Sequence, residues 1–200
     1  ELKALTSQIN PHFLYNTLDT IIWMAEFQDH QKVVDITKAL SNYFRLSLNA
    51  GEEIVTLRQE IEHVRQYLFI QKERYGDKLE YEIDEPDDFP DIKLPKIVLQ
   101  PLVENAIYHG IKESERPGKI TITVSKRDTF IDICIADNGV GIKENTTSTK
   151  ELGGVGIKNI QERLALFFGE AFSMEIESEP NAYTKVYLHL PLKEEGHANS

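Results

Sequence analysis

One segment of the chain could present a carboxylate to a nucleotide base. Residues 131–136 alternate apolar and polar side chains and lead into Asp137, which the sequence Asn-Gly-Val-Gly follows. The alternation predicts a half-buried strand that delivers the Asp137 carboxylate at its end. Such a carboxylate suits an exocyclic amine, for example adenine N6, while Gly139 and Gly141 let the backbone come close to a ligand. Alone, this segment indicates only a turn.

Two further segments strengthen the nucleotide interpretation. A second glycine cluster, Gly153-Gly154-Val155-Gly156, lies between a polar stretch and an expected helix. The polar stretch, residues 143–152, is placed where a lid over a nucleotide would lie. Upstream, residues 102–110 combine apolar residues with Glu104 and Asn105. Together and in this order, the three segments point to a nucleotide site.

The composition limits the classes of function. The chain has 200 residues, of which 40% are hydrophobic, and its formal net charge of -11 argues against a nucleic-acid partner. No run of about 20 apolar residues is present, so we predict no membrane crossing within this sequence. Cys134 is the single cysteine and excludes an internal disulfide, and the six histidines lack the spacing of a metal cage.

Apolar residues spaced by three and four predict helices through the first 75 residues. Three amphipathic helices with short joins are most easily buried as a bundle, which two chains could share. The first of these helices contains Pro11. The second and third have the stripes Val33, Ile36, Leu40, Phe44 and Leu48, and Leu57, Ile61, Val64, Leu68, Gln71 and Tyr75.

Pro11 divides the apolar face of the first helix. Proline removes a backbone donor and kinks a helix, so a change of buried face is reasonable there. His12, Asn16 and Asp19 then fall on the side away from the new stripe. A histidine with an amide at i+4 can be an exposed, reactive imidazole, although helix geometry alone favours an ordinary surface residue. The stripe after Pro11 comprises Leu14, Leu18, Ile21, Ile22 and Ala25.

The remainder of the chain is predicted to be mixed α/β. Pro95 can begin a helix that continues through Asn105 to about Gly110, in which Pro101 is a cost that requires a local reason. We expect a mainly antiparallel sheet covered on one face by helices, an α+β sandwich. Strands are predicted at 79–83, 120–125, 131–136, 174–176 and 186–190, and a helix at 157–168.

Four motifs in order resemble those of the sensor histidine kinases of the YesM/LytS type. They are residues 8–18 (Gln-Ile-Asn-Pro-His-Phe-Leu-Tyr-Asn-Thr-Leu), residues 99–107 (Leu-Gln-Pro-Leu-Val-Glu-Asn-Ala-Ile) and the two glycine segments. The resemblance covers roughly residues 1–192. It implies a helical dimerisation and phosphotransfer hairpin, residues 1–75, followed by an α/β sandwich of the Bergerat (GHKL) ATP-binding type, residues 76–200.

The resemblance also implies roles for individual residues. His12 occupies the position of the phospho-acceptor, and Asn105 that of the residue holding Mg²⁺ against the ATP phosphates. Asp137 corresponds to the adenine-binding aspartate, with Gly139 and Gly141 shaping its pocket.

Further positions follow from the same comparison of motifs. Gly154 and Gly156 match the glycines that let the lid and the following helix approach the phosphates. Thr184 could support Asp137 through a water molecule. Position 108 is often basic in such kinases and is Tyr108 here, so His109 or Lys158 could supply the positive charge instead.

Two departures from the family pattern bear on the chemistry. Phe13 follows His12 where many related kinases have an acidic residue, which leaves the general base open, with Asp19 and Glu104 as candidates and Asn16 beside the imidazole. Pro101 stands where ATP-hydrolysing relatives carry a glutamate, which favours transfer to an imidazole over hydrolysis.

The implied function is that of an ATP-dependent protein-histidine kinase. His12 would be phosphorylated from ATP with Mg²⁺ in a homodimer, and the phosphoryl group would pass to an aspartate of a response-regulator receiver domain. Contact with a membrane is expected only through an N-terminal sensor region outside this sequence, which would place the chain at the cytoplasmic face of the cell membrane. The alternatives are an ATPase or ATP-driven clamp, and a nucleotide-binding dimerisation module, on the same fold.

Overall fold

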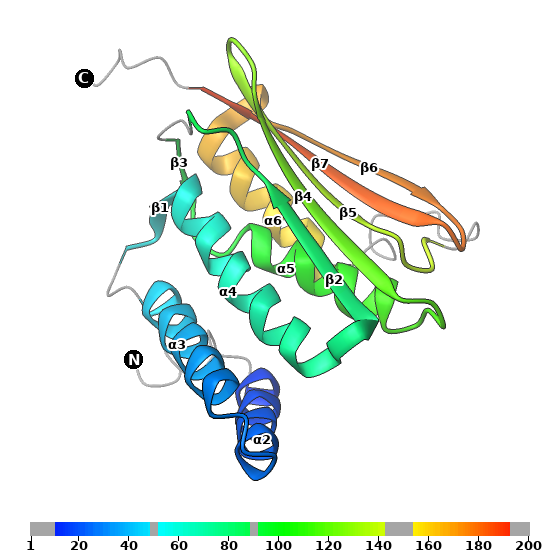
Figure 1. Cartoon of the computed structure of the whole chain (residues 1–200). Helices are drawn as coiled ribbons and strands as arrows, with labels where there is room; N and C mark the ends of the chain where they lie inside the picture. The colour runs from blue at the N-terminus through cyan, green and yellow to red at the C-terminus, as the bar shows by residue number, and fades with distance from the viewer. Residues whose placement is uncertain (1–10, 49–51, 89–91, 143–153, 193–200) are drawn as a thin grey trace.

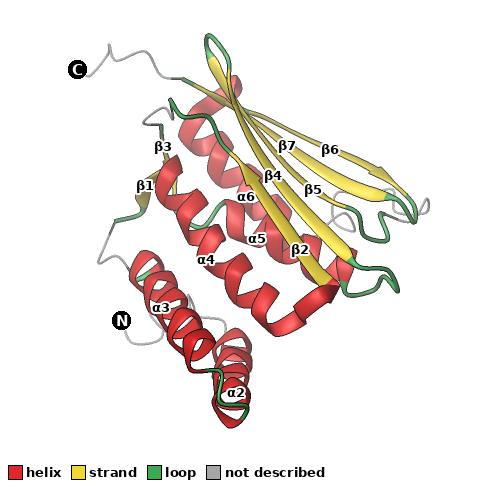
Figure 2. Cartoon of the chain, in the orientation of Figure 1, coloured by secondary structure: helices red, strands yellow, loops and turns green. Residues whose placement is uncertain are grey.

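A five-stranded sheet and a layer of helices form the larger part of the molecule in the computed structural model (Figure 1). The structure describes residues 11–48, 52–88, 92–142 and 154–192. Helices cover one face of the sheet, and a helical hairpin lies beside them (Figure 2). The predicted α+β class is confirmed.

The strands of the sheet lie in the order β2-β4-β5-β7-β6. Strand β2 runs parallel to β4, whereas the other three pairs are antiparallel, as the alternating sequences predict. In the register of the central strands, Asp137 lies opposite Ile120 on one side and Thr184 on the other. The strands are β2 (Leu79–Asp84), β4 (Gly118–Lys126), β5 (Phe130–Asp137), β6 (Ser173–Glu179) and β7 (Tyr183–Pro191).

Three helices pack against the sheet through one continuous apolar core. Helix α4 begins with a capping box, in which the Thr56 hydroxyl accepts from the Gln59 N–H and the Gln59 side chain accepts from the Thr56 N–H. Inward-facing isoleucines of β4 and β5 meet buried residues of these helices, including Leu68, Val103 and Leu164. The helices are α4 (Leu57–Tyr75), α5 (Leu99–Asn105) with its π-helical continuation η2 (Ala106–Ile111), and α6 (Gly154–Phe168); short 3-10 turns η1 (Gly76–Lys78) and η3 (Gly169–Ala171) follow α4 and α6.

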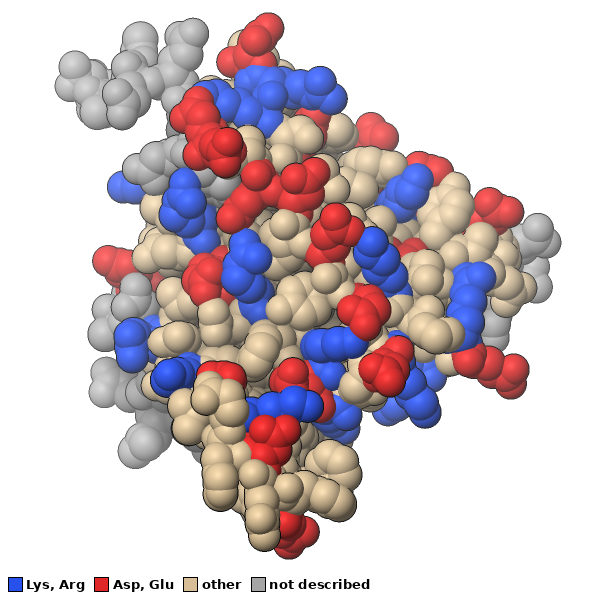
Figure 3. Space-filling view, in the orientation of Figure 1, with Lys and Arg blue, Asp and Glu red and all other residues tan. Residues whose placement is uncertain are grey.

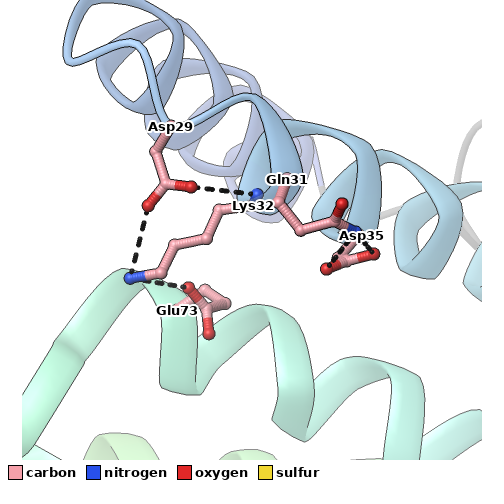
Figure 4. Close-up of polar contacts among 5 residues, drawn as sticks. All are labelled: Asp29, Gln31, Lys32, Asp35 and Glu73. Carbon is pink, nitrogen blue, oxygen red and sulfur yellow. Dashed lines mark hydrogen bonds and ion pairs between the residues drawn. The ribbon is translucent and has the colours of Figure 1, made fainter.

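The hairpin of α2 (Pro11–Glu26) and α3 (His30–Ser47) rests against α4. Phe13 of α2 is almost completely buried, with its ring centroid 4.9 Å from that of Tyr43 and 5.1 Å from that of Tyr67. At the other end of α3, the Asp29 carboxylate accepts from the Lys32 N–H. The Lys32 ammonium lies 3.8 Å from Asp29 and 3.9 Å from Glu73 of α4, as Figure 4 shows. Such an exposed pair contributes little, so apolar packing holds the hairpin in place.

Two short strands that the sequence did not predict join distant parts of the chain. Strand β1 (Ile54–Thr56) pairs antiparallel with β3 (Lys93–Pro95). The sequence predicted α4 as the third helix of a bundle. In the structure α4 directly follows strand β1, and it packs on α5 and β2 as well as on α3. The domain boundary at residues 75 and 76 stays a prediction.

The prediction that Pro95 begins a helix is wrong. Pro95 ends strand β3, and α5 begins at Leu99. Pro101 is consequently the third residue of α5. The N–H groups of the first turn have no partner within a helix, so the proline there removes no intrahelical hydrogen bond.

The predicted apolar stripe of α2 is only partly buried. Leu14 and Ile21 pack against the core, whereas Leu18, Ile22 and Ala25 are exposed. The buried positions of α2 are Phe13, Thr17 and Met24. The predicted change of face before Pro11 lies outside the described residues.

Apolar side chains thus remain uncovered on α2. Tyr15, Ile22 and Trp23 of α2, and Phe27, which directly follows the helix, are each more than half exposed. In Figure 3 the end of the molecule at which Figure 1 shows α2 carries few charges. Within the described residues, no helix combines the length and apolar character needed to cross a bilayer.

A buried histidine joins α3 to α4. His63 Nε2 lies 2.7 Å from Ser47 Oγ, and its ring stacks on Tyr43 with a centroid distance of 4.6 Å. The Ser47 hydroxyl donates to the Tyr43 carbonyl, so its oxygen is left to accept from Nε2. Burial lowers the pKa of His63 from 6.5 to about 4.

We predict that His63 makes the fold sensitive to acid. The unfolded chain binds a proton at this group more readily than the folded chain does. Its contribution to stability is therefore complete above pH 6.5 and is lost as the pH falls toward 4, by up to about 3 kcal/mol. Urea unfolding would measure the free energy of unfolding at pH 7.5 and at pH 5. This free energy should fall less between the two pH values in His63→Leu than in the wild type.

His30→Gln provides the matched control, because His30 is an exposed histidine on α3. This variant should keep the wild-type dependence on pH. An unchanged dependence in His63→Leu would contradict the prediction.

Candidate functional site

The carboxylate of Asp137 lies buried at the end of β5. Only 7% of its surface is exposed, and Oδ1 accepts a hydrogen bond of 2.9 Å from the Gly139 N–H. Burial raises the pKa of this carboxyl from 3.8 to about 6, although the bond from Gly139 opposes the shift. A buried carboxylate with one protein donor retains acceptor capacity for a ligand.

Two glycines from separate elements come into contact beneath this carboxylate. A Cβ atom on Gly139 would lie 2.3 to 2.5 Å from backbone atoms of Gly110, and one on Gly110 would lie 2.4 Å from Asp137 Oδ1. The Val140 N–H also donates to the Gly110 carbonyl. Gly110 belongs to the π-helix η2, a local widening that often marks functional sites.

Hydrogen bonds join the segment after Asp137 to the end of β6 and to the turn between β6 and β7. The Asn181 N–H donates to the Val140 carbonyl, and the Ile142 N–H donates to Ser178 Oγ. Gly141 has φ +64°, and a Cβ atom there would lie 2.1 Å from the Glu179 carbonyl oxygen. Thr184, opposite Asp137 in the sheet, has its hydroxyl 3.2 Å from Ser178 Oγ.

Helix α5 carries two polar residues with predicted roles. Asn105 is its last residue, and the Asn105 amide nitrogen is buried without a hydrogen-bond partner among the described residues. An orphaned amide of this kind fits a site that a ligand completes. Glu104 is half-buried and accepts from the Gln100 amide at 2.8 Å. Burial raises the pKa of Glu104, and the bond from Gln100 opposes that shift.

The start of α5 is held by a side chain from another helix. The carboxylate of Glu60 on α4 accepts hydrogen bonds from the N–H groups of Ile97, Val98 and Leu99, at 2.5, 2.8 and 3.0 Å. No side chain of the preceding residue caps α5. Glu60 therefore supplies the missing cap from α4.

The remaining predicted positions are more exposed. His109 is exposed on η2, and Lys158 is exposed on α6, where it pairs with Glu162 at 3.5 Å. Gly154 is the first residue of α6, and Gly156 lies in its first turn, where a Cβ atom would meet no described atom within 4 Å. The predicted lid, residues 143–152, and Gly153 lie outside the described residues.

His12 is located on a different element from Asp137 and Asn105. It lies in the first turn of α2 and is exposed, and the Asn16 amide nitrogen lies 3.1 Å from both ring nitrogens. The predicted i+4 partnership of these two residues is present. Asp19 is exposed on the same helix.

The structure thus brings Asp137, Gly139 and Gly110 together and places Thr184 opposite Asp137 in the sheet. Asn105 ends the helix that continues into η2, and His12 lies on the hairpin. Sequence reasoning did not give Gly110 a role in this site. A glycine within a mainly apolar helical segment indicates that another part of the backbone comes close to it. The sequence does not say that this part is Gly139.

Comparison with known proteins identifies the family. The family of histidine kinases matches residues 1–79, and the family of histidine kinase-, DNA gyrase B- and HSP90-like ATPases matches residues 91–194. The sensor histidine kinase YesM of Bacillus subtilis is 36% identical over 195 residues, covering 98% of this chain and 34% of YesM. The sensor protein LytS of Bacillus anthracis is 33% identical over 202 residues, covering 96% of this chain and 34% of LytS. The chain spans about a third of the length of these relatives.

A solved structure has the same fold. It is the histidine kinase domain of the blue-light activated histidine kinase from Erythrobacter litoralis EL346, with a TM-score of 0.56 and 15% identity over 96% of this chain and 93% of that one. Sequence and fold agree with one another. The chain belongs to the sensor histidine kinases of the YesM/LytS type, with a GHKL ATP-binding part.

Proposed function

We propose that this chain is the catalytic portion of a sensor histidine kinase, which phosphorylates His12 from ATP with Mg²⁺. The observation that carries the proposal is the buried Asp137 carboxylate, which Gly139 orients and Gly110 closely approaches. A carboxylate without a countercharge in an apolar setting costs stability, and a ligand's amino group offsets that cost.

The residues of the site fit a nucleotide with its metal. Asp137 would accept a hydrogen bond from the adenine amino group, and the side-chain oxygen of Asn105 would hold Mg²⁺ on the phosphate side. The buried Asn105 amide nitrogen has no partner among the described residues and would donate to a bound ligand. Bound ATP and Mg²⁺ supply the phosphoryl group and neutralise its charge. Gly154 and Gly156 at the start of α6 would allow backbone N–H groups to face the phosphates. Lys158 or His109 would add positive charge.

His12 attacks through an unprotonated ring nitrogen. The Asn16 amide, which contacts the imidazole, would orient the ring for this step. Glu104 is the proposed proton acceptor, because burial raises the pKa of its carboxyl and makes it a stronger base than an exposed glutamate. Thr184 would support Asp137 from the neighbouring strand.

The proposal extends to the longer protein to which this chain would belong. We propose a homodimer formed through the hairpin, a receiver-domain aspartate as the next phosphoryl acceptor, and attachment to the cytoplasmic face of a membrane through an N-terminal sensor region. The exposed apolar side chains of α2 support the dimer, because a contiguous apolar surface of this kind marks an interface. The division into a hairpin part, 1–75, and an ATP-binding part, 76–200, belongs to the same proposal.

Transfer of label from ATP tests the proposed function. The wild type incubated with γ-labelled ATP and Mg²⁺ should acquire acid-labile, base-stable label. We expect His12→Gln and Asn105→Ala to acquire less than about a hundredth of it, because one lacks the acceptor and the other the metal ligand. His30→Gln, an exposed histidine of α3, is the matched control and should label normally. Full labelling of His12→Gln would move the acceptor elsewhere.

Asp137→Asn should raise the stability of the fold while it weakens the binding of ATP. An acid whose pKa is raised on folding opposes folding above that pKa, and its penalty disappears as the pH falls from about 6 toward 4. We expect the variant to be more stable than the wild type at pH 7.5, by about 1 to 3 kcal/mol, and to lose binding of a fluorescent ATP analogue.

Asp132→Asn is the control on the same strand. Asp132 Oδ1 lies 2.7 Å from His189 Nδ1, so this substitution removes a favourable pair and should lower stability slightly without affecting ATP binding. Normal ATP binding by Asp137→Asn would contradict the assignment of the adenine site.

A charge on the exposed face of α2 should dissociate the dimer. Ile22→Lys would bury an unpaired ammonium in the proposed interface, whereas Ile22 is more than half exposed in the single chain. Sedimentation should show a dimer for the wild type and a monomer for the variant, and circular dichroism should show the same helix content in both. Leu166→Lys, at an exposed position of α6, should remain dimeric. A wild-type monomer at all accessible concentrations would reject the proposed interface.

A further inference from the structure

Four backbone carbonyl oxygens converge on one point beside the nucleotide turn, defined here as residues 138–141. They belong to Asn138, Gly139, Asn181 and Ala182. All four lie between 2.7 and 2.9 Å from a single atom, Nη2 of Arg116. The nitrogen carries only two hydrogens, so these contacts share donors, and the attraction is that of a cation in a ring of carbonyl dipoles.

The ring draws its carbonyls from two turns that would otherwise repel each other at this point. Asn138 and Gly139 belong to the nucleotide turn, and the other two belong to the β6–β7 turn, defined here as residues 180–182. The negative ends of four carbonyl dipoles facing one another need a positive charge between them. Among the described residues no carboxylate pairs with the Arg116 guanidinium, so its charge is available to these dipoles alone.

The ring connects directly to the adenine-binding carboxylate. Gly139 offers its carbonyl to Arg116 at 2.9 Å and its N–H to Asp137 Oδ1, also at 2.9 Å. The Asn138 carbonyl, which also accepts from Arg116, belongs to the same peptide group as the Gly139 N–H, so the guanidinium contacts the peptide groups on both sides of the residue that orients Asp137. On the other side of the ring, the Asn181 N–H donates to the Val140 carbonyl, and φ of Asn181 is +60°, in the left-handed region.

We propose that the four carbonyls form a cation site which Arg116 fills with its own guanidinium, and that this tethered cation holds the nucleotide turn in the geometry that binds ATP. Arg116 is thus a positioning residue for the reaction. It acts through Gly139 on Asp137. Backbone carbonyls in a ring are also the ligands that replace the hydration shell of K⁺, so a free monovalent cation is a reasonable substitute when the side chain is removed.

Chemical rescue tests this assignment, which rests on the proposed ATP binding. A fluorescent ATP analogue with Mg²⁺ would be titrated into the wild type, Arg116→Ala and Arg116→Lys. Each titration would be made in choline chloride, potassium chloride and guanidinium chloride, at equal ionic strength and at concentrations that do not unfold the protein. We expect Arg116→Ala to bind about tenfold more weakly than the wild type in choline chloride. Potassium or guanidinium should restore at least threefold of that loss, and Arg116→Lys should lie between the two proteins without added cation.

A matched variant and a second readout keep the outcomes distinct. Arg127→Met removes the same charge at the opposite end of the β4–β5 hairpin, where Arg127 pairs with Asp132, and should bind the analogue normally. Amide hydrogen exchange without nucleotide should show loss of protection at Val140 and Asn181 in Arg116→Ala and its recovery with the rescuing cation. This readout does not depend on ATP, so a wild type that fails to bind the analogue rejects the proposed function while exchange still tests the site.

Three results would overturn the inference. One is unchanged analogue binding and exchange in Arg116→Ala. Another is a loss of binding that neither potassium nor guanidinium reduces, since that would assign Arg116 a packing role without a cation site. The third is an equal loss in Arg127→Met, which would attribute the effect to net charge.

Discussion

The buried carboxylate of Glu60 fixes the helix that carries Glu104 and Asn105. It is only 2% exposed, and it accepts three consecutive backbone N–H groups at the start of α5. Burial raises the pKa of this carboxyl, and the three hydrogen bonds and the Arg163 charge oppose the shift. A buried charge is costly unless it is fully hydrogen-bonded, so the helix start and the carboxylate depend on each other.

The same junction sets the position of α6. Arg163 of α6 donates to the Lys96 carbonyl at 2.8 Å, one residue before Ile97, whose φ of +58° is unusual for a β-branched side chain. The bond from Ile97 to Glu60 offsets the strain of that conformation. Three helices of the sandwich therefore meet at residues 96–99, and the distance between Asn105 on α5 and the glycines of α6 depends on this contact.

The residues proposed to face the nucleotide were named from the sequence, whereas the residues that support them were not. Asp137, Gly139 and Asn105 stand in short segments that resemble the nucleotide-binding motifs of the family, and these motifs can be recognised from residue types and spacing. Glu60 and Arg116 act on backbone groups that lie 22 or more residues away, and a single sequence carries no signal of such pairings.

The same distinction holds for the fold. Period-two alternation predicted every strand of the large sheet, because those strands are six or more residues long and bury one face. Strands β1 and β3 have three residues each, too few for any period. Helical spacing found the buried face of α4 but could not say that this face meets a sheet and α5 as well as α3.

These contacts indicate where the chain would bend between His12, the proposed acceptor, and the proposed ATP site. A pivot near Tyr75 would have to detach α4, which its capping box, the Glu60 carboxylate and the core hold to the sandwich. The hairpin itself is attached chiefly through packing, with Phe13 between Tyr43 and Tyr67. Releasing a buried phenylalanine costs about 3 kcal/mol, which corresponds to roughly one molecule in a hundred or fewer. Because Phe13 directly follows His12, any motion that frees the Phe13 ring also moves His12, the proposed phospho-acceptor.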